Sequence, residues 1–482
     1  MSLRRLVFIV AAVVEGTAAV MLTASVVAVV YREWDEALAI TLGALVVLAL
    51  ADLVRRGAAR TGELTMREGF AAVGLSWCAM VAVGTIPYLV TGTVGGFTEI
   101  FFETASGFTT TGATVIATPE MLPRSILWWR ALTQWIGGMG IIVLSIAILP
   151  LLGVGGVQLA RAEWPGGQPD RLTPRFRETA KRLWLVYLAF TVAAAISYVV
   201  AGMGPFDALT HSLTTLSTGG FSTRTDSLAA FSTSAQWVAI TFMFLGGTSF
   251  VLHLRALKHP GDYLRSAEFR LFGMIVLAAA AFLAVGTWGD AVVDHIRSSL
   301  FTVLAIITTT GYTVSDWGRW GDGVQVMIVG LMFVGGMAGS TSGSIKVYRL
   351  GILYQGSRAD MRRLIHPRGV FVTRLGHQQV PEKIAESVQS FFILYMFLFM
   401  TGIVAFAVIE AFAGIPIDLA TSVSSVASAL GNIGPGLSEV GPISTFAGVP
   451  TAGKWLLSFL MIVGRLEIFP IVLLFTREMW RR

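Results

Sequence analysis

Residues 106–115 read SGFTTTGATV, in which three threonines and a glycine directly follow an apolar run. Three related stretches follow later in the chain: SLTTLSTGGFST at 212–223, LAIITTTGYTV at 304–314 and VASALGNIGPGL at 426–437. Aligning the four stretches places four glycines in register, Gly112, Gly219, Gly311 and Gly434, at intervals of 107, 92 and 123 residues. Internal repetition on this scale predicts one structural unit built four times around a shared axis.

The composition places this repeat in a membrane. Hydrophobic residues make up 54% of the 482 residues and charged residues 13%, whereas about a quarter of a soluble domain is charged. Ten apolar blocks are long enough to cross a hydrocarbon core as helices, at 6–30, 37–54, 69–91, 126–152, 183–201, 235–254, 271–288, 324–345, 388–412 and 455–475. Four segments richer in serine and threonine are too short to cross, at 97–109, 206–217, 296–309 and 418–431.

The order of these segments predicts an all-α integral membrane protein with two N-terminal spans and four helix–pore loop–helix repeats around a pseudo-fourfold pore. We place the unit boundaries at 1–66 for the two-span domain and at 67–160, 161–262, 263–360 and 361–482 for repeats 1 to 4. Cys78 is the only cysteine, which excludes an intrachain disulfide and a cysteine metal site.

The basic residues predict the orientation. With the N-terminus inside the cell, 27 of the 35 lysines and arginines fall in cytoplasmic segments, as expected for membrane proteins. Both termini are therefore predicted to be cytoplasmic, and the four short segments to enter from outside. The net charge of +6 follows from this asymmetry and requires no nucleic acid.

Each short segment followed by a threonine-glycine turn is typical of an ion pathway. Non-helical backbone at membrane depth is tolerated where it lines water or is buried in protein. Four such turns around an axis define a pore whose carbonyl oxygens can replace the hydration shell of an ion. The carboxyl ends of four short helices would favour a cation there, and threonine hydroxyls would add oxygen ligands at the inner end.

The turns TTTGAT, STGGFS, TTTGYT and GNIGPG resemble the four filter loops of the Trk/Ktr/HKT superfamily of potassium transporters. The stretch at 128–166, which begins WWRALTQWIGGMG, and the two extra N-terminal spans are similar to the bacterial TrkH type. The resemblance implies potassium uptake through a filter lined by Thr110, Thr111, Gly112, Ala113, Ser217, Thr218, Gly219, Gly220, Thr309, Thr310, Gly311, Tyr312, Asn432, Ile433, Gly434 and Pro435.

Two details of the filter bear on the ion. In the superfamily, serine at the first signature position accompanies sodium permeation, so Gly112 favours potassium. The fourth loop departs from the threonine pattern at Asn432 and Ile433, a departure that TrkH-type proteins share.

The eighth span contains GLMFVGGMAGSTSGSIKVYRL from residue 330, which is too rich in glycine and serine to form a good helix interior. We expect the helix to break there, and the resemblance implies an intramembrane gate formed by Gly335, Gly336, Ala338, Gly339, Ser340, Thr341, Ser342, Gly343 and Ser344. The alternative is close packing of helices through small residues.

Arg465 lies in the middle of the last span, where a charge costs about 2.5 to 3.5 kcal/mol unless it meets water or a partner. The resemblance implies an arginine that points into the cavity beneath the filter and hinders cations while the gate is closed. The alternative is a structural pair with another helix. Glu467 is two residues away and therefore lies off that helical face.

Outside the pore, the 346–386 segment is long and basic, which favours attraction to the inner leaflet and docking of a soluble subunit. The resemblance implies a homodimer in the bacterial inner membrane, with a cytosolic TrkA-type regulatory subunit that binds NAD(H) or ATP/ADP, so that nucleotide is expected only on the partner. Glu120, Asp226, Asp316 and Glu439 follow the filter glycines and could concentrate cations, or be solvated loop charges without a role.

Other functions are less well supported by the sequence. An intramembrane enzyme would need paired catalytic groups, and the chain contains no HExxH, no GxSxG and no aspartate pair within a span. A carrier for organic solutes and a sodium-permeable transporter of the same fold are the alternatives. Passive conduction and coupling to protons or sodium are equally compatible with the sequence.

Overall fold

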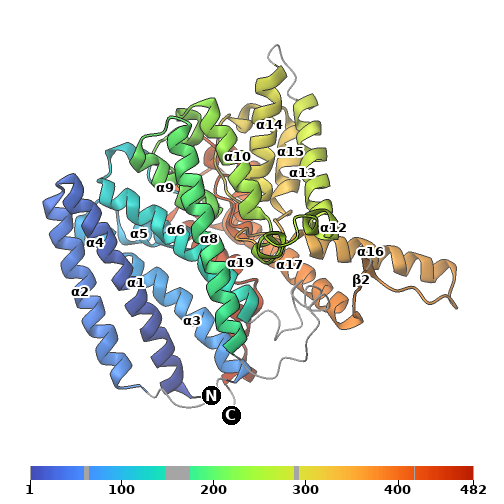
Figure 1. The fold of residues 1–482 in the computed structure, drawn as a ribbon, viewed down its shortest axis with the longest axis horizontal. Coiled ribbons are helices and arrows are strands. Elements are labelled where there is room, and N and C mark those ends of the chain that lie inside the picture. Colours follow the sequence, from blue (N-terminus) through green and yellow to red (C-terminus); the bar gives the residue numbers. More distant parts are fainter. Residues whose placement is uncertain are drawn as a thin grey trace.

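Helices dominate the described part of the chain. The computed structural model describes residues 2–58, 65–147, 174–286, 292–376, 378–416 and 418–480. The strands in these ranges are β1 (Arg374–Leu375) and β2 (Gln378–Gln379), which pair antiparallel as a small hairpin. The prediction of an all-α protein is confirmed (Figure 1).

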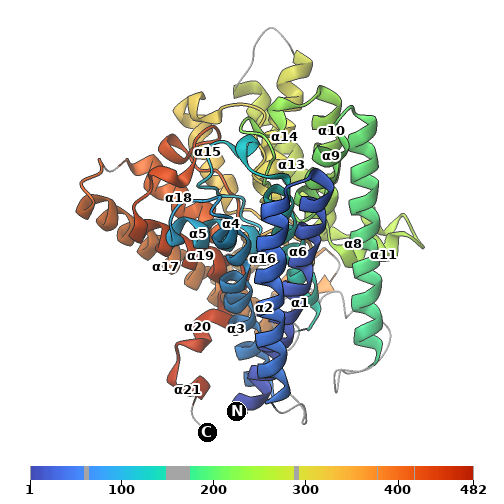
Figure 2. The same ribbon diagram turned by 90° about the vertical axis from the view of Figure 1, so that its left-hand side faces the viewer.

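The two N-terminal spans form an antiparallel pair on one side of the molecule. α1 (Leu3–Tyr31) and α2 (Trp34–Arg56) stand in front of the repeats in Figure 2. Leu42 and Leu50 of α2 are 55% and 59% exposed. Large apolar side chains left open in this way suit a helix that faces lipid, because hydrocarbon does not penalise their exposure.

Four short helices, hereafter the pore helices, occupy the positions of the four short segments, as predicted. They are α5 (Phe97–Phe108), α9 (Pro205–Leu216), α14 (Val292–Ile307) and α18 (Leu419–Gly431). Their starts have clear local causes: Pro205 is the first residue of α9, and the Asp418 carboxylate accepts the backbone N–H groups of Ala420 and Thr421. Both features stabilise a helix N-terminus.

Longer helices flank each pore helix. The first spans of the repeats are α3 (Met66–Gly84) with α4 (Ile86–Thr91), α8 (Pro174–Val200), α13 (Ala267–Gly286) and α17 (Glu382–Phe412). The second spans begin with α6 (Arg124–Ala147), α10 (Thr233–Gly247), α15 (Asp322–Met332) and α19 (Thr451–Arg465).

The repeats close into a ring. Each pore helix packs against the second span of its own repeat and against the second span of the preceding repeat: α9 on α10 and α6, α14 on α15 and α10, and α18 on α19 and α15. The first pore helix, α5, packs on α6 and on α19, so the fourth repeat meets the first. This cycle confirms the predicted pseudo-fourfold arrangement.

Three of the ten predicted spans, the second spans of repeats 2, 3 and 4, are interrupted. On length and composition, six described helices can cross a membrane, and α10 with α11 (Phe250–Ala256) makes a seventh although the two meet at 98°. The break at 335–344 was predicted. The breaks at 248–249 and 466–468 were not predicted, because Thr-Ser after two glycines and Leu-Glu-Ile near the end of an apolar block are weak signals for a break.

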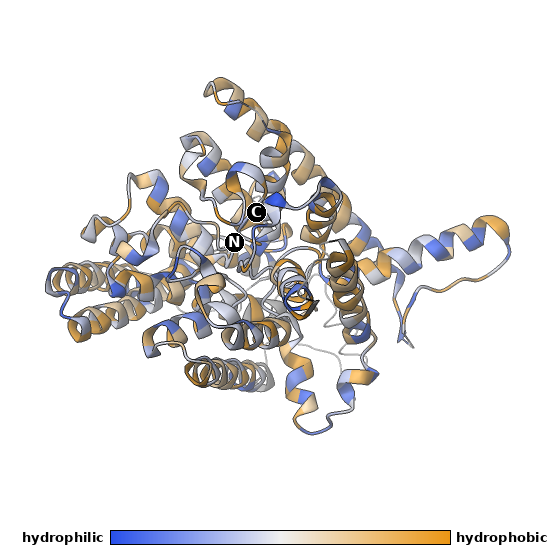
Figure 3. Ribbon diagram, turned by 90° about the horizontal axis from the view of Figure 1, so that it is seen from above, coloured by the Kyte–Doolittle hydropathy of each residue, from blue (hydrophilic) through white to orange (hydrophobic). Residues whose placement is uncertain are grey.

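Further helices follow the broken spans. They comprise α12 (Asp262–Arg265), α16 (Val347–Ile365), α20 (Phe469–Leu474) and α21 (Arg477–Trp480). Figure 3 shows α16 projecting sideways from the body. Leu6 of α1, Phe70 of α3 and Met479 of α21 pack in one cluster, so the first and last helices meet at the same end of the molecule.

Short 3-10 turns follow the pore loops on the side that is predicted to face outward, hereafter the outer side. They are η1 (Pro119–Met121), η3 (Ser227–Ala230), η4 (Trp317–Arg319) and η5 (Ser438–Val440), with η6 (Phe446–Gly448) further along. Their recurrence extends the internal repeat beyond the motif itself. Of the predicted unit boundaries, the one at residue 160 lies outside the described residues, and the others stay predictions.

Candidate functional site

The backbone of the four turns repeats closely and corrects their alignment. A left-handed residue ends each pore helix region, with φ of 53° at Thr110, 53° at Thr218, 57° at Thr309 and 56° at Asn432. Two residues later comes a glycine with positive φ: Gly112, Gly220, Gly311 and Gly434. Gly220, and not Gly219, is therefore the counterpart of Gly112. The sequence alignment failed here because repeat 2 has two adjacent glycines.

These glycines bring the four turns into contact around a closed ring. A β-carbon at Gly112 would lie 2.2 Å from the carbonyl oxygen of Gly219 in the next turn. A β-carbon would likewise lie 1.8 Å from the Thr310 carbonyl oxygen if added at Gly220, and 1.9 Å from the Ile433 carbonyl oxygen if added at Gly311. At Gly434 it would lie 2.8 Å from the Thr111 carbonyl oxygen. Positive φ and close backbone approach both require glycine, so main-chain oxygens line the ring.

Several side chains in and just before the four turns bond back into the protein. The Thr109 and Thr308 hydroxyls donate to carbonyls one helical turn earlier, those of Ala105 and Leu304, at 2.7 and 2.6 Å. The Tyr312 hydroxyl lies 2.5 Å from the Thr214 hydroxyl of the neighbouring repeat. The buried Thr110 hydroxyl, by contrast, has no hydrogen-bond partner among the described residues, so it remains available beside the main-chain oxygens.

Gln134 of α6 supports the turn of repeat 2 directly. Its amide nitrogen donates to the Gly219 carbonyl at 2.7 Å, and its amide oxygen accepts the Phe221 N–H at 3.1 Å. A β-carbon at Gly219 would lie 2.4 Å from the Gln134 side chain. Gly219 is thus required for this packing, although it is not the signature glycine.

A buried ion pair supports the turns of repeats 1 and 2. Arg130 and Glu103 are 2% and 0% exposed and lie 2.8 Å apart. Glu103 accepts hydrogen bonds from Thr114 and from the Val115 N–H, and Arg130 donates to the Ser222 carbonyl at 3.1 Å. One pair therefore connects pore helix α5, α6 and two outer turns. Neither residue was identified from the sequence, although a charge inside each of two apolar segments was visible.

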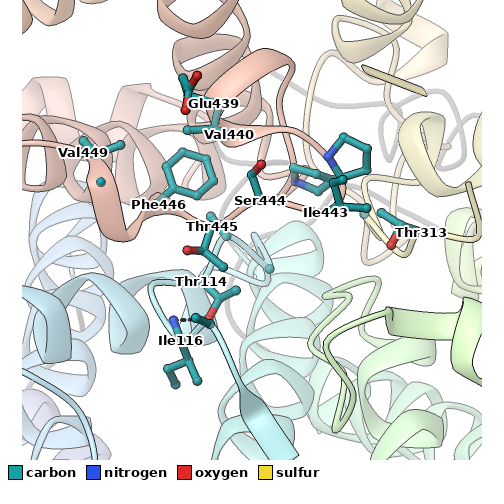
Figure 4. A pocket seen from close by; sticks show the side chains of 18 of the residues that line it. Thr114, Ile116, Thr313, Glu439, Val440, Ile443, Ser444, Thr445, Phe446 and Val449 are labelled. Carbon is teal, nitrogen blue, oxygen red and sulfur yellow. Dashed lines mark hydrogen bonds between the residues drawn. The ribbon is translucent and has the colours of Figure 1, made fainter. Parts of the chain in front are cut away.

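On the outer side, the ring forms the floor of a cavity of about 760 Å³. The four signature glycines, Gly112, Gly220, Gly311 and Gly434, line this cavity. The outer segment of repeat 4 reaches over it, and the Phe446 N–H donates to the Thr114 carbonyl at 2.8 Å. Figure 4 shows Ser444, Thr445 and Phe446 beside Thr114.

Few of the predicted outer acids reach this cavity. Glu439 lines the cavity, whereas Glu120, Asp226 and Asp316 do not. Glu120 instead binds the Thr225 backbone and hydroxyl at 2.6 and 2.7 Å; burial raises its pKa, but these hydrogen bonds outweigh burial and lower the pKa below its usual value. Glu410 and Asp418, which sequence reasoning missed, also line the cavity.

On the inner side, the 335–344 loop lies against the pore segments of several repeats. The Thr341 hydroxyl donates to the Leu216 carbonyl at 3.0 Å and accepts from the Thr218 hydroxyl at 3.2 Å. The Gly343 N–H donates to the Thr309 hydroxyl at 2.7 Å. A β-carbon at Gly343 would lie 2.3 Å from the Gly431 carbonyl oxygen. The loop thus touches pore segments of repeats 2, 3 and 4.

The unpredicted break between α10 and α11 provides partners for this loop. The Gly247 carbonyl accepts the Met337 N–H at 2.9 Å, and the Phe250 N–H donates to the Gly339 carbonyl at 3.0 Å. Ser344 and Gly335 close the loop on itself through Met332 and Ile345. Two interrupted helices therefore satisfy each other's free backbone groups, as a membrane interior requires. The predicted gate residues, from Gly335 to Ser344, are all brought together in this one loop.

Arg465 is buried at the end of α19 and binds two backbone carbonyls. Its guanidinium donates to Thr341 O at 2.6 Å and to Gly137 O of α6 at 3.2 Å. Its partners are thus the 335–344 loop and repeat 1. The contact with α6 fits the alternative of a structural pair with another helix, and the role of Arg465 in a cavity beneath the filter stays a prediction.

Several buried charges beneath the loop were missed in the sequence. Arg349 of α16 pairs with Glu467 and lies 3.9 Å from the centre of the Phe391 ring. Lys346 donates to Ser342, and Glu268 of α13 accepts the Ala338 N–H at 2.7 Å. The signal was present as charges at the ends of apolar blocks, but such positions usually snorkel to water, so the sequence alone did not distinguish them.

The chain is similar to known proteins over nearly its whole length. Residues 38–481 match the TrkH family, described as a cation transport protein. The Trk system potassium uptake protein TrkH of Salmonella typhimurium is 37% identical over 474 residues, which cover 96% of each chain. That of Vibrio parahaemolyticus is 38% identical over 434 residues, covering 87% of each. The crystal structure of the potassium transporter TrkH from Vibrio parahaemolyticus matches over 100% of both chains, with a TM-score of 0.91 and 34% identity. The resemblance drawn from the four turns is confirmed.

Proposed function

Because this chain belongs to the TrkH family of cation transport proteins, we propose that it takes up potassium through a selectivity filter made of backbone carbonyl oxygens. The filter consists of the four turns, with Gly112, Gly220, Gly311 and Gly434 as its signature glycines. The names of the relatives, which are potassium uptake proteins, support the choice of ion.

The observation that carries this proposal is the closed ring of backbone contacts between the four turns. Potassium loses its hydration shell when it enters such a ring, and carbonyl dipoles compensate for the loss. The four pore helices end at the ring and direct the negative ends of their dipoles toward it. Glycine at each signature position leaves the ring free of side chains that would alter its width.

The 335–344 loop is the gate in this proposal, and Arg465 is the charge that opposes cations beneath it. The contacts of the loop with Thr218 and Thr309 support its place below the filter. The guanidinium of Arg465 keeps a positive charge close to the ion pathway. This charge disfavours the entry of cations as long as the loop stays in the position described.

The remaining expectations complete the proposal. The protein spans the bacterial inner membrane with both termini in the cytoplasm and is built from five units, the two-span domain and four repeats. It works as a homodimer with a cytosolic regulatory subunit of the TrkA type that carries the nucleotide. The common name of the relatives, which assigns them to a Trk system, supports a multi-subunit arrangement.

Growth at low potassium tests the function. Bacteria that lack their own potassium uptake systems are expected to grow at low potassium when they produce this chain with its cognate regulator. Gly311→Ala is expected to abolish growth, because its β-carbon would lie 1.9 Å from the Ile433 carbonyl oxygen. Failure of the wild-type chain to restore growth, although it is present in the membrane, would contradict the proposal.

A further inference from the structure

Two oppositely charged residues bind the 335–344 loop from below. We propose that Lys346 and Glu268 form a latch that holds this loop closed and sets the rate of potassium flux when no regulator acts. The inference rests on the proposed function, because it assumes that the loop is the gate. It adds two positioning residues that lie outside the four turns and outside the 335–344 loop.

Lys346 is the first half of the latch. It is 4% exposed, and its ammonium group donates to the hydroxyls of Ser342 at 3.2 Å and Ser340 at 3.5 Å and to the Ser342 carbonyl. Ser342 in turn accepts the Gly336 N–H at 2.9 Å, and its hydroxyl lies 2.7 Å from that of Ser340. The Lys346 ammonium group therefore binds the end of the loop directly, and through the Ser342 hydroxyl it is connected to Gly336 at the start of the loop.

Glu268 is the second half, and it comes from another helix. Its carboxylate accepts the Ala338 N–H at 2.7 Å, at the point where the loop turns from its descending to its returning arm. Glu268 lies in the first turn of α13. The loop is therefore held between the start of α13 and the start of α16.

The latch stabilises the closed loop because of where its charges lie. A buried ammonium group is costly unless hydrogen bonds and opposite charges satisfy it. Lys346 has its loop partners when the loop is in this position, and it loses them when the loop moves away. Replacing it with a neutral residue removes this preference and shifts the equilibrium toward the open loop.

Neighbouring charges connect the latch to α16. Lys346 immediately precedes this helix, and Arg349, one turn later, pairs with Glu467 beside the end of α19. A displacement of α16 would move Lys346 and strain the Arg349–Glu467 pair together. The Arg465 hydrogen bond to Thr341 then remains as a separate restraint on the loop.

The test is potassium-tracer flux into liposomes that contain the purified full-length chain without a regulatory subunit. Lys346→Gln is expected to raise this flux by at least about tenfold, because hydrogen bonds to charged groups are among the stronger ones. Lys346→Arg keeps the charge and the donors and is expected to stay near the wild-type rate. The preference for potassium over sodium is expected to be unchanged in both variants, because neither touches the filter turns.

Lys454 provides a matched control. It is also 4% exposed and donates to Glu99 at 2.8 Å, but it lies on α19 away from the loop, beside the outer segment that contains Ala447. Lys454→Gln is expected to leave the unregulated flux at the wild-type rate. An equal rise in Lys454→Gln and Lys346→Gln would overturn the latch, because it would indicate general loosening of the protein.

A second variant is used if Lys346→Gln does not fold. If Lys346→Gln is not monodisperse in detergent, Ser340→Ala with Ser342→Ala removes two hydroxyl acceptors and is expected to raise the flux about threefold, since neutral partners contribute less. If a folded, potassium-selective variant has the same flux as the wild type, the latch is overturned and the proposed function is not. Absence of potassium flux in the wild type with and without regulator overturns the proposed function, and the latch with it.

Discussion

The two faces of the filter are built in different ways. On the outer face, four turns of nearly the same backbone conformation contribute one glycine each, and the cavity above them is shared by all repeats. On the inner face, a single loop from repeat 3 lies against the pore segments. Charged groups from repeats 3 and 4 bind that loop.

In the proposed function, this difference separates ion selection from control of the flux. Selection requires a fixed ring of oxygens, and main-chain groups in four equivalent turns supply it without side-chain charge. Control requires an element that can take two positions, so one repeat departs from the others and its backbone is freed from the helix. Buried charges then hold the loop, because their partners are lost on movement. The ring of four turns is symmetric and is built from backbone groups. The 335–344 loop breaks the symmetry and is bound by ionised side chains.

The largest expected effect concerns the symmetric ring. Gly220→Ala is expected to lower potassium flux by more than about 100-fold, because an alanine must adopt positive φ and its β-carbon would lie 1.8 Å from the Thr310 carbonyl oxygen. Gly219→Ala meets the Gln134 side chain, and no backbone oxygen is among its nearest contacts, so it is expected to cost less than Gly220→Ala, about tenfold. Tracer flux of the two purified variants distinguishes them. A larger loss in Gly219→Ala would show that the ring is not built as described.

A second prediction tests the support of the ring. Arg130→Gln leaves Glu103 buried without its partner and is expected to lower the free energy of unfolding by about 3 to 5 kcal/mol. The preference for potassium over sodium is expected to fall as well, because Thr114 and Ser222 lose their common anchor. Thermal unfolding in detergent and flux of both ions measure these effects. Unchanged stability would contradict the assigned role of the pair.

A third prediction concerns the asymmetric side. Arg465→Gln is expected to raise unregulated potassium flux by about tenfold, because the loop loses a charged hydrogen bond and the pathway loses a positive charge. Arg465→Lys keeps the charge and is expected to change the flux less. Selectivity is expected to stay constant in both. A change of selectivity without a change of rate would mean that Arg465 acts on the filter.

The smallest effect is expected at the outer mouth. Glu439→Gln removes one acid from the outer cavity and is expected to lower potassium uptake by less than about twofold at low ionic strength. The effect is expected to vanish at high salt, where exposed charges are screened. Asp316→Asn, at an acid that lies outside the cavity lining, serves as the control. An equal effect of both changes would argue against a local role of Glu439.

The symmetric part of the molecule was largely predictable from the sequence. Hydropathy and the threonine-glycine motif located the pore helices to within a few residues, because short apolar segments before such turns have few other interpretations. The register of repeat 2 was wrong by one residue, since two adjacent glycines cannot be told apart without backbone angles. The break of the third repeat was found because many residues without helix preference occur together there.

The asymmetric part was less predictable. The break after Gly247 has little local signal and exists because the 335–344 loop supplies hydrogen bonds from elsewhere in the chain. Lys346 and Glu268 are 78 residues apart in sequence, and their common contact with the loop follows from tertiary structure alone. Arg130 and Glu103 pair for the same reason. Charges near span ends usually reach water, so their burial cannot be read from composition.

The most direct test of the central claim is the ratio of potassium to sodium flux through the purified chain in liposomes, measured for the wild type and for Gly112→Ser. We predict at least about tenfold preference for potassium in the wild type, as expected of a carbonyl-lined filter, and a clear loss of preference in Gly112→Ser, whose side chain would enter the ring beside Gly219. Equal flux of the two ions through the wild type, or an unchanged ratio in the variant, would contradict the claim that these four turns select the ion.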